Sequence, residues 1–183
     1  MEYSTLLRPA TLSDIEPLQA LMRRSIRRLS DGFYSPIEAE AAERFIAVPD
    51  PDVIADGTFY VIEATGEIVA CGGWSARRKL FTGSSEQEGL SDERLDPRVD
   101  AARIRAFFID PGHARQGLGT VLYLECKRSA LAAGFMSLEL VATLPGVPFY
   151  ARLGFEEVEP VPAKLPDGTV LPCIRMCRTI AKK

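Results

Sequence analysis

Residues 103–120 of the chain read RIRAFFIDPGHARQGLGT. The apolar first half predicts a strand that ends at a proline, and the second half leads into an amphipathic helix. The N-terminus of a helix presents unpaired backbone N–H groups and a partial positive charge. Gly117 and Gly119 allow a ligand to approach this backbone closely, and Arg115 and Gln116 add side-chain donors. The stretch therefore predicts an anion site of the phosphate-binding kind, unless the glycines serve only to pack the helix tightly on the strand.

A second motif lies about thirty residues further on, where residues 148–155 read PFYARLGF. Pro148 near the start and Gly154 after the end predict a short helix. Tyr150 on such a helix can point its hydroxyl into a cleft of the sheet. Taken by itself, the commoner explanation is a core tyrosine whose hydroxyl bonds to a neighbour.

The rest of the chain predicts a mixed α/β fold in a single domain that spans residues 1–183. Ser13 and Ser35 each precede a glutamate by three residues, which predicts a capping box at the start of each of the first two helices. The prolines and glycine of residues 49–57 predict a loop. The expected strands lie at about 5–8, 58–63, 68–74, 103–109, 137–142, 155–160 and 174–179, and the expected helices at about 13–29, 35–46, 118–131 and 148–153.

Composition narrows the class of protein. The 183 residues carry 22 basic and 25 acidic side chains, a net charge of −3, which argues against a nucleic-acid-binding protein. Four cysteines without CxxC spacing and a single histidine argue against a metal site. The sequence shows neither a signal-peptide pattern nor an apolar run long enough to cross a membrane. We therefore expect a cytoplasmic protein with reduced thiols.

Residues 79–100 are polar and lack periodicity, and they form an insertion with six carboxylates and two late arginines. A loop of this length inside a domain is usually functional or disordered. One interpretation is that this acidic insertion lies over a substrate site and attracts a cationic amine. The other is a solvated loop whose charges aid solubility.

The two motifs, in this order and at this spacing, resemble those of the GNAT N-acetyltransferase superfamily. The pyrophosphate loop of that family reads Arg/Gln-x-x-Gly-x-Gly/Ala, and residues 114–119 read ARQGLG, with Ala114 in place of the usual arginine or glutamine. The later motif of the family reads Phe-Tyr-x-x-x-Gly-Phe, which residues 149–155 match at every fixed position. The resemblance implies a central mixed, mostly antiparallel sheet flanked by helices, with splayed fourth and fifth strands. It also implies acetyl-CoA as the co-substrate.

The resemblance assigns roles to residues of both motifs. Main-chain groups of the fourth strand would bind the pantetheine arm of acetyl-CoA, and the amides that follow would bind its pyrophosphate. Tyr150 would protonate the leaving thiolate as a general acid. Thr143 stands close to where the family often has an asparagine. The implied cofactor-binding residues are Phe107, Phe108, Ile109, Arg115, Gln116, Gly117, Leu118, Gly119, Thr120 and Thr143.

The resemblance does not assign the general base or the acceptor-binding residues as closely as it assigns the cofactor-binding residues. Glu63 and Glu139 either act as a base through water or form structural ion pairs. The family binds its acceptor with the first two helices, the hairpin and the loop before the fourth strand, and these carry Tyr34, Trp74 and Arg77 here. Trp74 either lines that site or packs in the core.

We therefore expect an acetyltransferase that acts on the primary amine of a small molecule by direct attack in a ternary complex. The alternatives are a protein or peptide N-acetyltransferase and a non-catalytic acyl-CoA-binding sensor. The last expected strand, 174–179, is apolar, and a strand of this kind at a sheet edge favours a homodimer.

Overall fold

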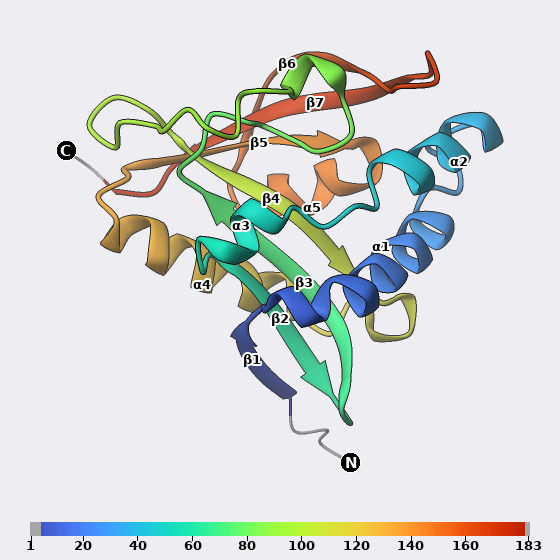
Figure 1. Cartoon of the computed structure of the whole chain (residues 1–183), viewed down its shortest axis with the longest axis horizontal. Helices are drawn as coiled ribbons and strands as arrows, with labels where there is room; N and C mark the ends of the chain where they lie inside the picture. Colours follow the sequence, from blue (N-terminus) through green and yellow to red (C-terminus); the bar gives the residue numbers. More distant parts are fainter. Residues whose placement is uncertain (1–4, 182–183) are drawn as a thin grey trace.

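The structure is a computed structural model of the chain, and it describes residues 5–181 (Figure 1). The first four residues, on which the expectation about a signal peptide rests in part, lie outside the described range. The fold is a seven-stranded sheet in the order β1-β2-β3-β4-β5-β7-β6. Every neighbouring pair is antiparallel except β4 and β5, which are parallel. The predicted mixed, mostly antiparallel sheet is confirmed.

All seven expected strands are present, and their ends differ from the predictions by a few residues. Turn residues separate β2 from β3 and β6 from β7, so each of these pairs forms a hairpin. The strands are β1 (Thr5–Pro9), β2 (Phe59–Ala64), β3 (Glu67–Ser75), β4 (Ala102–Ile109), β5 (Ser137–Thr143), β6 (Glu156–Lys164) and β7 (Val170–Thr179).

The helices include one that the sequence reading assigned to a loop. That helix is α3 (Pro51–Ala55), which begins where the side chain of Asp50 accepts a hydrogen bond from the Asp52 amide at 3.1 Å. An N-cap aspartate followed by proline is a start signal that outweighs the loop reading of the same prolines. The other helices are α1 (Ile15–Leu29), α2 (Pro36–Phe45), α4 (Leu118–Ala132) and α5 (Val147–Arg152).

One of the two predicted capping boxes is confirmed and the other is shifted. Ser35 caps α2 and exchanges hydrogen bonds with Glu38, as expected. At the start of the chain, however, a short 3-10 turn (Leu12–Asp14) precedes α1, and Thr11 is its cap. Asp14 accepts a hydrogen bond from the Thr11 amide at 2.7 Å, so the cap lies two residues before Ser13.

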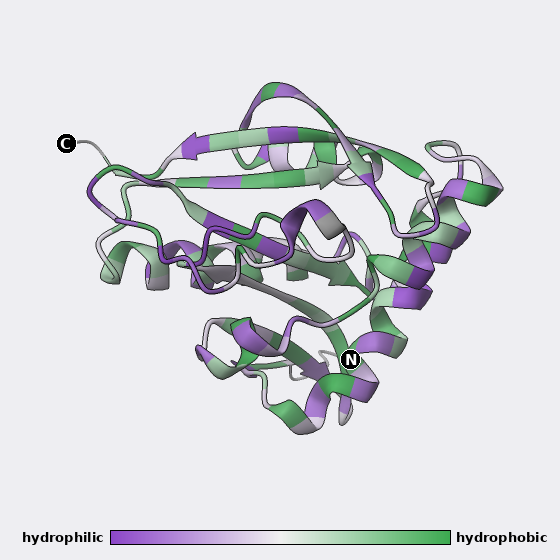
Figure 2. Cartoon of the chain, turned by 45° about the horizontal axis from the view of Figure 1, so that its top comes forward, coloured by the Kyte–Doolittle hydropathy of each residue, from purple (hydrophilic) through white to green (hydrophobic). Residues whose placement is uncertain are grey.

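Helices cover both faces of the sheet, and the sheet separates the core into two parts (Figure 1). Helices α4 and α5 pack on one face, while α1, α2 and α3 pack on the other. Leu18, Leu21 and Met22 of α1 are fully buried, and the opposite side of that helix is polar. Figure 2 shows the resulting alternation of hydrophilic and hydrophobic colour along α1. None of the described helices has the length and hydropathy of a membrane span.

The last strand does not lie at an edge. β7 is enclosed between β5 and β6, so its apolar residues belong to the core of this chain. The exposed edge on that side is β6, which carries Pro160 and Pro162. Prolines lack the N–H group that pairing with a further strand requires. The expectation that the last strand forms a sheet edge is therefore wrong, and the homodimer that was inferred from it stays a prediction.

Strands β4 and β5 diverge soon after they start. The register pairs Ala102 with Leu138 and Arg103 with Glu139, and the ladder stops there. In addition, the pairing of β4 with β3 shifts between Cys71 and Gly73. These irregularities produce the predicted splay between the fourth and fifth strands.

A bulge in β4 changes the direction of its side chains. Ala106 adopts φ +52°, which is rare for a residue with a Cβ atom. As a result, Ala106 packs with the core under α1 and α2, whereas Ile104, two residues before it, packs with the core under α4 and α5. A bulge of this kind next to a gap in the sheet is typical of functional sites.

Candidate active site

A cavity of about 750 Å³ opens where β4 and β5 diverge. One half of it is formed by the C-terminal part of β4, the first turn of α4 and helix α5. The other half is formed by α1, the loop between α1 and α2, the end of α2 and residues 80–82 of the insertion. We call these the α4 half and the α1 half of the cavity. Both sequence motifs therefore contribute to the same cavity.

The loop before α4 has the backbone shape of an anion site. Arg115 has φ +63° and Gly117 has φ +83°, so both occupy the left-handed region. Thr120 and Val121 donate their amides to the carbonyl of Gly117. Within the described chain, the amides of residues 115–119 donate to no backbone carbonyl in turns, loops or caps. These N–H groups, together with the positive end of the helix dipole, suit a phosphate group.

The two glycines of the loop serve different purposes. Gly117 is needed for its conformation, because a Cβ atom built there meets nothing within 4 Å but φ is +83°. Gly119 is needed for packing, because a Cβ atom there would lie 2.8 Å from the Phe149 ring. The close-packing alternative thus applies to Gly119, while the approach of a ligand to Gly117 stays a prediction. Of the other loop residues, Leu118 and Thr120 line the cavity, whereas Gln116 is exposed and points its amide at the Gly112 carbonyl, 3.4 Å away.

The edge of β4 that faces β5 offers free backbone groups. The amide of Asp110 donates to Val69 of β3 at 2.8 Å. Because backbone groups alternate in direction along a strand, those of Ile109 and Phe107 face the opposite side, toward the gap. Phe107, Phe108 and Ile109 all line the cavity. This open edge can pair with a ligand that carries amides of its own.

Tyr150 lies on the wall of the cavity and is 9% exposed. Its ring contacts Phe107, Phe149 and Phe155, with centroids 6.2, 5.1 and 5.7 Å apart. Burial raises the pKa of Tyr150 well above its ordinary value. The hydroxyl is therefore protonated at neutral pH and can donate a proton or a hydrogen bond.

Tyr34 and Thr143 both line the cavity, and Thr143 is the last residue of β5. The hydroxyl of Tyr34, in the loop between α1 and α2, donates to the carbonyl of Pro172 at 2.7 Å. The same hydroxyl accepts a hydrogen bond from the amide of Leu144 at 2.8 Å. Tyr34, which lines the cavity, thus joins the α1–α2 loop to the end of β5 and to β7. Sequence reasoning placed Tyr34 near an acceptor but gave no sign of this bridge, because its partners are more than 100 residues away.

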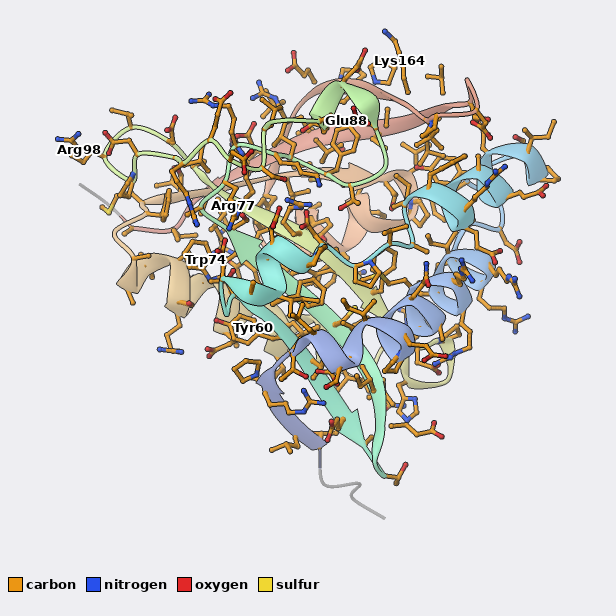
Figure 3. The ribbon with its side chains drawn as sticks, in the orientation of Figure 1. Tyr60, Trp74, Arg77, Glu88, Arg98 and Lys164 are labelled. Carbon is orange, nitrogen blue, oxygen red and sulfur yellow. The ribbon has the colours of Figure 1, made fainter. Side chains whose placement is uncertain are left out.

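Trp74 and Arg77 do not reach the cavity. The ring of Trp74 packs edge-to-face on Phe135, with centroids 5.7 Å apart, in the core under α4. Arg77 donates two hydrogen bonds to the Asp56 carboxylate, at 2.6 and 2.7 Å. Figure 3 shows both residues on the left side of the sheet, away from α1 and α2. Of the two alternatives for Trp74, packing in the core is therefore the correct one.

The two glutamates considered as bases form ion pairs. Glu63 bonds to Arg8 of β1 at 2.5 Å. Glu139 bonds to Arg103 of β4 and to Arg175 of β7. Each glutamate therefore holds neighbouring strands together, as the structural alternative states. Neither lines the cavity in the described part of the chain.

Arg105 is a residue of the site that the sequence reading did not single out. Its side chain is almost wholly buried and it lines the α1 half of the cavity. It donates to the Asp50 carboxylate at 2.8 Å, to the Thr82 hydroxyl at 3.0 Å and to the Lys79 carbonyl at 3.1 Å. The signal in the sequence was an arginine inside an apolar strand, which requires a buried partner.

The acidic insertion contributes little charge to the cavity. Glu86 pairs with Lys164, Glu93 with Arg78, and Asp96 with Arg98, all outside it. Glu88 and Arg98 mark the outer course of this segment in Figure 3. Among the residues of the insertion whose side chains the structure describes, Leu80, Phe81 and Thr82, at its beginning, reach the cavity.

Comparison with known proteins places these features in context. Residues 23–155 match the acetyltransferase (GNAT) family. No curated protein matches the sequence. Among solved structures, a GCN5-related N-acetyltransferase ("Aminotransferase, Class-II") from Rhodopseudomonas palustris has a TM-score of 0.73 and 21% identity, with 98% of both chains covered.

Two further structures were solved with a bound nucleotide cofactor. PaiA N-acetyltransferase from Thermoplasma acidophilum, in complex with coenzyme A, has a TM-score of 0.66 and 14% identity, covering 96% of this chain and 99% of that one. YncA from Salmonella typhimurium, with acetyl-CoA, has a TM-score of 0.63 and 13% identity, covering 98% and 96%. At these identities the likeness concerns the fold.

Proposed function

Because the chain belongs to the GNAT family of acetyltransferases, we propose that it transfers the acetyl group of acetyl-CoA to the primary amine of a small molecule. The transfer is direct, with both substrates in one cavity, and takes place in the cytoplasm. The observation that carries the proposal is that the anion-type loop, the open edge of β4 and the protonated Tyr150 all line that cavity. A reduced compartment suits the four free thiols, three of which are buried.

The α4 half of the cavity fits the donor. The free amides of residues 115–119 suit the pyrophosphate, and the backbone of Phe107 and Ile109 suits the amides of the pantetheine arm. The positive side chain of Arg115, at the same loop, favours a phosphate-bearing ligand. When bound, acetyl-CoA supplies an activated acetyl group and a thiolate leaving group. Two structural neighbours that contain CoA or acetyl-CoA support this assignment.

Tyr150 acts on the leaving sulfur in this proposal. Its raised pKa keeps the hydroxyl proton in place until a thiolate forms. Placement of this proton at the sulfur lowers the barrier for departure of the thiolate by general acid catalysis. A backbone N–H on the open edge of β4 polarises the carbonyl that the amine attacks.

The bridge made by Tyr34 supports a small acceptor over a protein. An extended peptide needs an open groove along the sheet. Here the hydroxyl of Tyr34 ties the α1–α2 loop to Leu144 and to Pro172, beside the cavity that Tyr34 lines. A loop held in this way favours a small acceptor, because a small amine does not need the loop to open.

Two measurements test the proposal in turn. If Kd is about 10 μM, acetyl-CoA at about 1 mM stabilises the protein by about 2.7 kcal/mol and raises Tm by roughly 5–10 °C. Thiol release is then followed with a panel of small amines and of peptides with free N-termini. We expect turnover with small amines. Binding without turnover would favour the sensor alternative, turnover of peptides alone would favour a protein N-acetyltransferase, and no thermal shift would overturn all three.

A further inference from the structure

The α1 half of the cavity has an apolar wall. Helix α1, the end of α2 and the start of the insertion supply mostly aliphatic and aromatic side chains to it. The polar groups between them are small hydroxyls, of which Ser25 and Ser30 are themselves buried. The apolar lining residues are Ile26, Leu29, Ala42, Ile46, Leu80 and Phe81.

The charged groups near this wall disfavour the binding of a cation. Arg105 is the charged side chain that lines it, and the carboxylate of Asp50 behind Arg105 is shared with Lys79 at 3.2 Å. Two positive groups thus surround one negative group. The Tyr34 hydroxyl is occupied by its two backbone partners, and burial raises the pKa of Tyr34, so it stays neutral.

The titratable groups that face in from the α4 half do not reverse this balance. They are His113 after β4, Arg115 before α4, and Tyr150 and Arg152 on α5. Tyr150 is neutral at neutral pH and the arginines are positive. Every lining residue of the cavity that the structure describes is thus neutral or basic.

We propose, on the basis of the proposed function, that the acceptor is an apolar, weakly basic amine of the aromatic-amine class, which enters this half uncharged. An ammonium group would lose its hydration against an apolar wall and gain no carboxylate partner there. An alkylamine with a pKa of about 10.4 is neutral in only roughly one molecule per thousand at pH 7.4. An aromatic amine is neutral at that pH and its ring suits the wall of Leu80 and Phe81.

This acceptor also fits the absence of a glutamate at the site in the described residues. The lone pair of the neutral nitrogen forms the bond to the acetyl carbon, and the bond between that carbon and sulfur breaks. The nitrogen releases one proton to water, and the sulfur receives one from Tyr150, which is replenished by solvent. No side chain is then required to deprotonate an ammonium ion before attack.

Two isomeric amines test the proposal with the intact protein. 4-Methylaniline and benzylamine have the same atoms and nearly the same shape, but only benzylamine is a cation at pH 7. We expect kcat/KM for 4-methylaniline to exceed that for benzylamine at least tenfold at pH 7, and the ratio to fall as the pH rises toward the pKa of benzylamine. Spermidine and a lysine peptide are expected to be poorer than both. Better turnover of spermidine or benzylamine at pH 7 would overturn the proposal.

A charge introduced into the wall separates this effect from the intrinsic reactivity of the amines. Phe81→Glu is expected to shift the preference toward benzylamine at least tenfold relative to Phe81→Gln, which is nearly isosteric and uncharged. If the Phe81 variants do not fold, Leu80→Glu and Leu80→Gln make the same comparison. Equal preferences in the Glu and Gln members of a folded pair would contradict the electrostatic argument.

Failure of this acceptor proposal can be distinguished from failure of the proposed function. Failure to bind acetyl-CoA, or the release of no thiol with any amine, counts against acetyl transfer itself. Turnover confined to cationic amines leaves acetyl transfer standing and rejects only the uncharged, apolar acceptor.

Discussion

The ring of Phe107 lies directly over the α-carbon of Gly72, so that a Cβ atom built on Gly72 would stand 2.5 Å from ring atom Cδ2. The same ring contacts Tyr150 at a centroid distance of 6.2 Å. Gly72 on β3 therefore sets the position of an aromatic side chain on β4, and that side chain borders Tyr150. A glycine without an unusual φ is thus tied to the site through packing alone.

Gly72→Ala is expected to displace the Phe107 ring and to impair catalysis. Overpacking of this kind costs about 1–3 kcal/mol of stability. We expect kcat/KM for acetyl-CoA to fall about tenfold, because a shift of the Phe107 ring also shifts the backbone at the open edge of β4, which is proposed to bind the donor. Gly73→Ala is the matched control, since its Cβ atom would meet Thr58 and Phe59 at 2.6 and 2.8 Å on the other side of the sheet. An equal loss of kcat/KM in both variants, at equal Tm, would show that Phe107 has no special part.

Tyr150→Phe is expected to reduce kcat by about a hundredfold, the scale of general acid catalysis. The fold should persist, because the substitution keeps the ring contacts with Phe107, Phe149 and Phe155. Tyr123→Phe is the control, since Tyr123 is a buried tyrosine outside the cavity. Steady-state kinetics across pH compare the two variants. An unchanged kcat in Tyr150→Phe would remove the proposed proton donor.

Gly117→Ala is expected to weaken acetyl-CoA binding more than it weakens the fold. An L-residue in the left-handed region costs roughly 1–2 kcal/mol, and the open surroundings of Gly117 add no clash. Gly168→Ala is the control, because Gly168, in the turn between β6 and β7, has a similar positive φ of +88° and equally open surroundings. We therefore expect a similar fall in Tm for both variants, and a rise in the Kd for acetyl-CoA, measured by calorimetry, for Gly117→Ala only.

Asp50→Asn is expected to destabilise the protein and to change its response to acid. Burial by itself would raise the pKa of Asp50, but Arg105 and Lys79 outweigh this and lower the pKa below its ordinary value. A carboxyl group with a lowered pKa contributes stability that is present above its unfolded pKa, about 3.9, and is lost as the pH falls through the lower folded value. Removal of the charge leaves Arg105 buried without its partner, at a cost of about 3–5 kcal/mol.

Urea unfolding between pH 7 and pH 3 measures this effect. The difference in free energy of unfolding between the wild type and Asp50→Asn should be largest at neutral pH and shrink below pH 4. Asp167→Asn, in the exposed turn between β6 and β7, should leave the neutral-pH stability within about 0.5 kcal/mol. A pH-independent difference for Asp50→Asn would mean that its charge is not what stabilises Arg105.

The parts of this fold that the sequence predicts are those governed by local rules. The strands and the long helices follow from periodicity and from the start and stop signals of helices. The short helix α3 was missed because Pro51 signals a loop and a helix start equally well. The position of Tyr150 at the cavity follows from the family motif at residues 149–155, and the local sequence by itself favours a core tyrosine.

The parts that the sequence does not predict depend on contacts between distant residues. Arg105 meets Asp50 across 55 residues, and Tyr34 meets Pro172 across 138. The position of Trp74 illustrates the same difficulty. It follows the glycines of β3, and only the packing of Phe135 decides that its ring enters the core and not the cavity. Side-chain direction near a bulge such as that at Ala106 is likewise fixed by the whole sheet.

The brief pairing of β4 with β5 has a consequence for hydrogen exchange. With only two residue pairs joining them, four strands on one side and three on the other meet through a narrow seam. A ligand that pairs with the open edge of β4 would extend that seam and complete the hydrogen bonding of the sheet. Amide protons of Phe107 and Ile109 should then exchange quickly with deuterated solvent in the free protein and slowly with donor bound. Binding of the ligand would thus be detected as slower amide hydrogen exchange along β4.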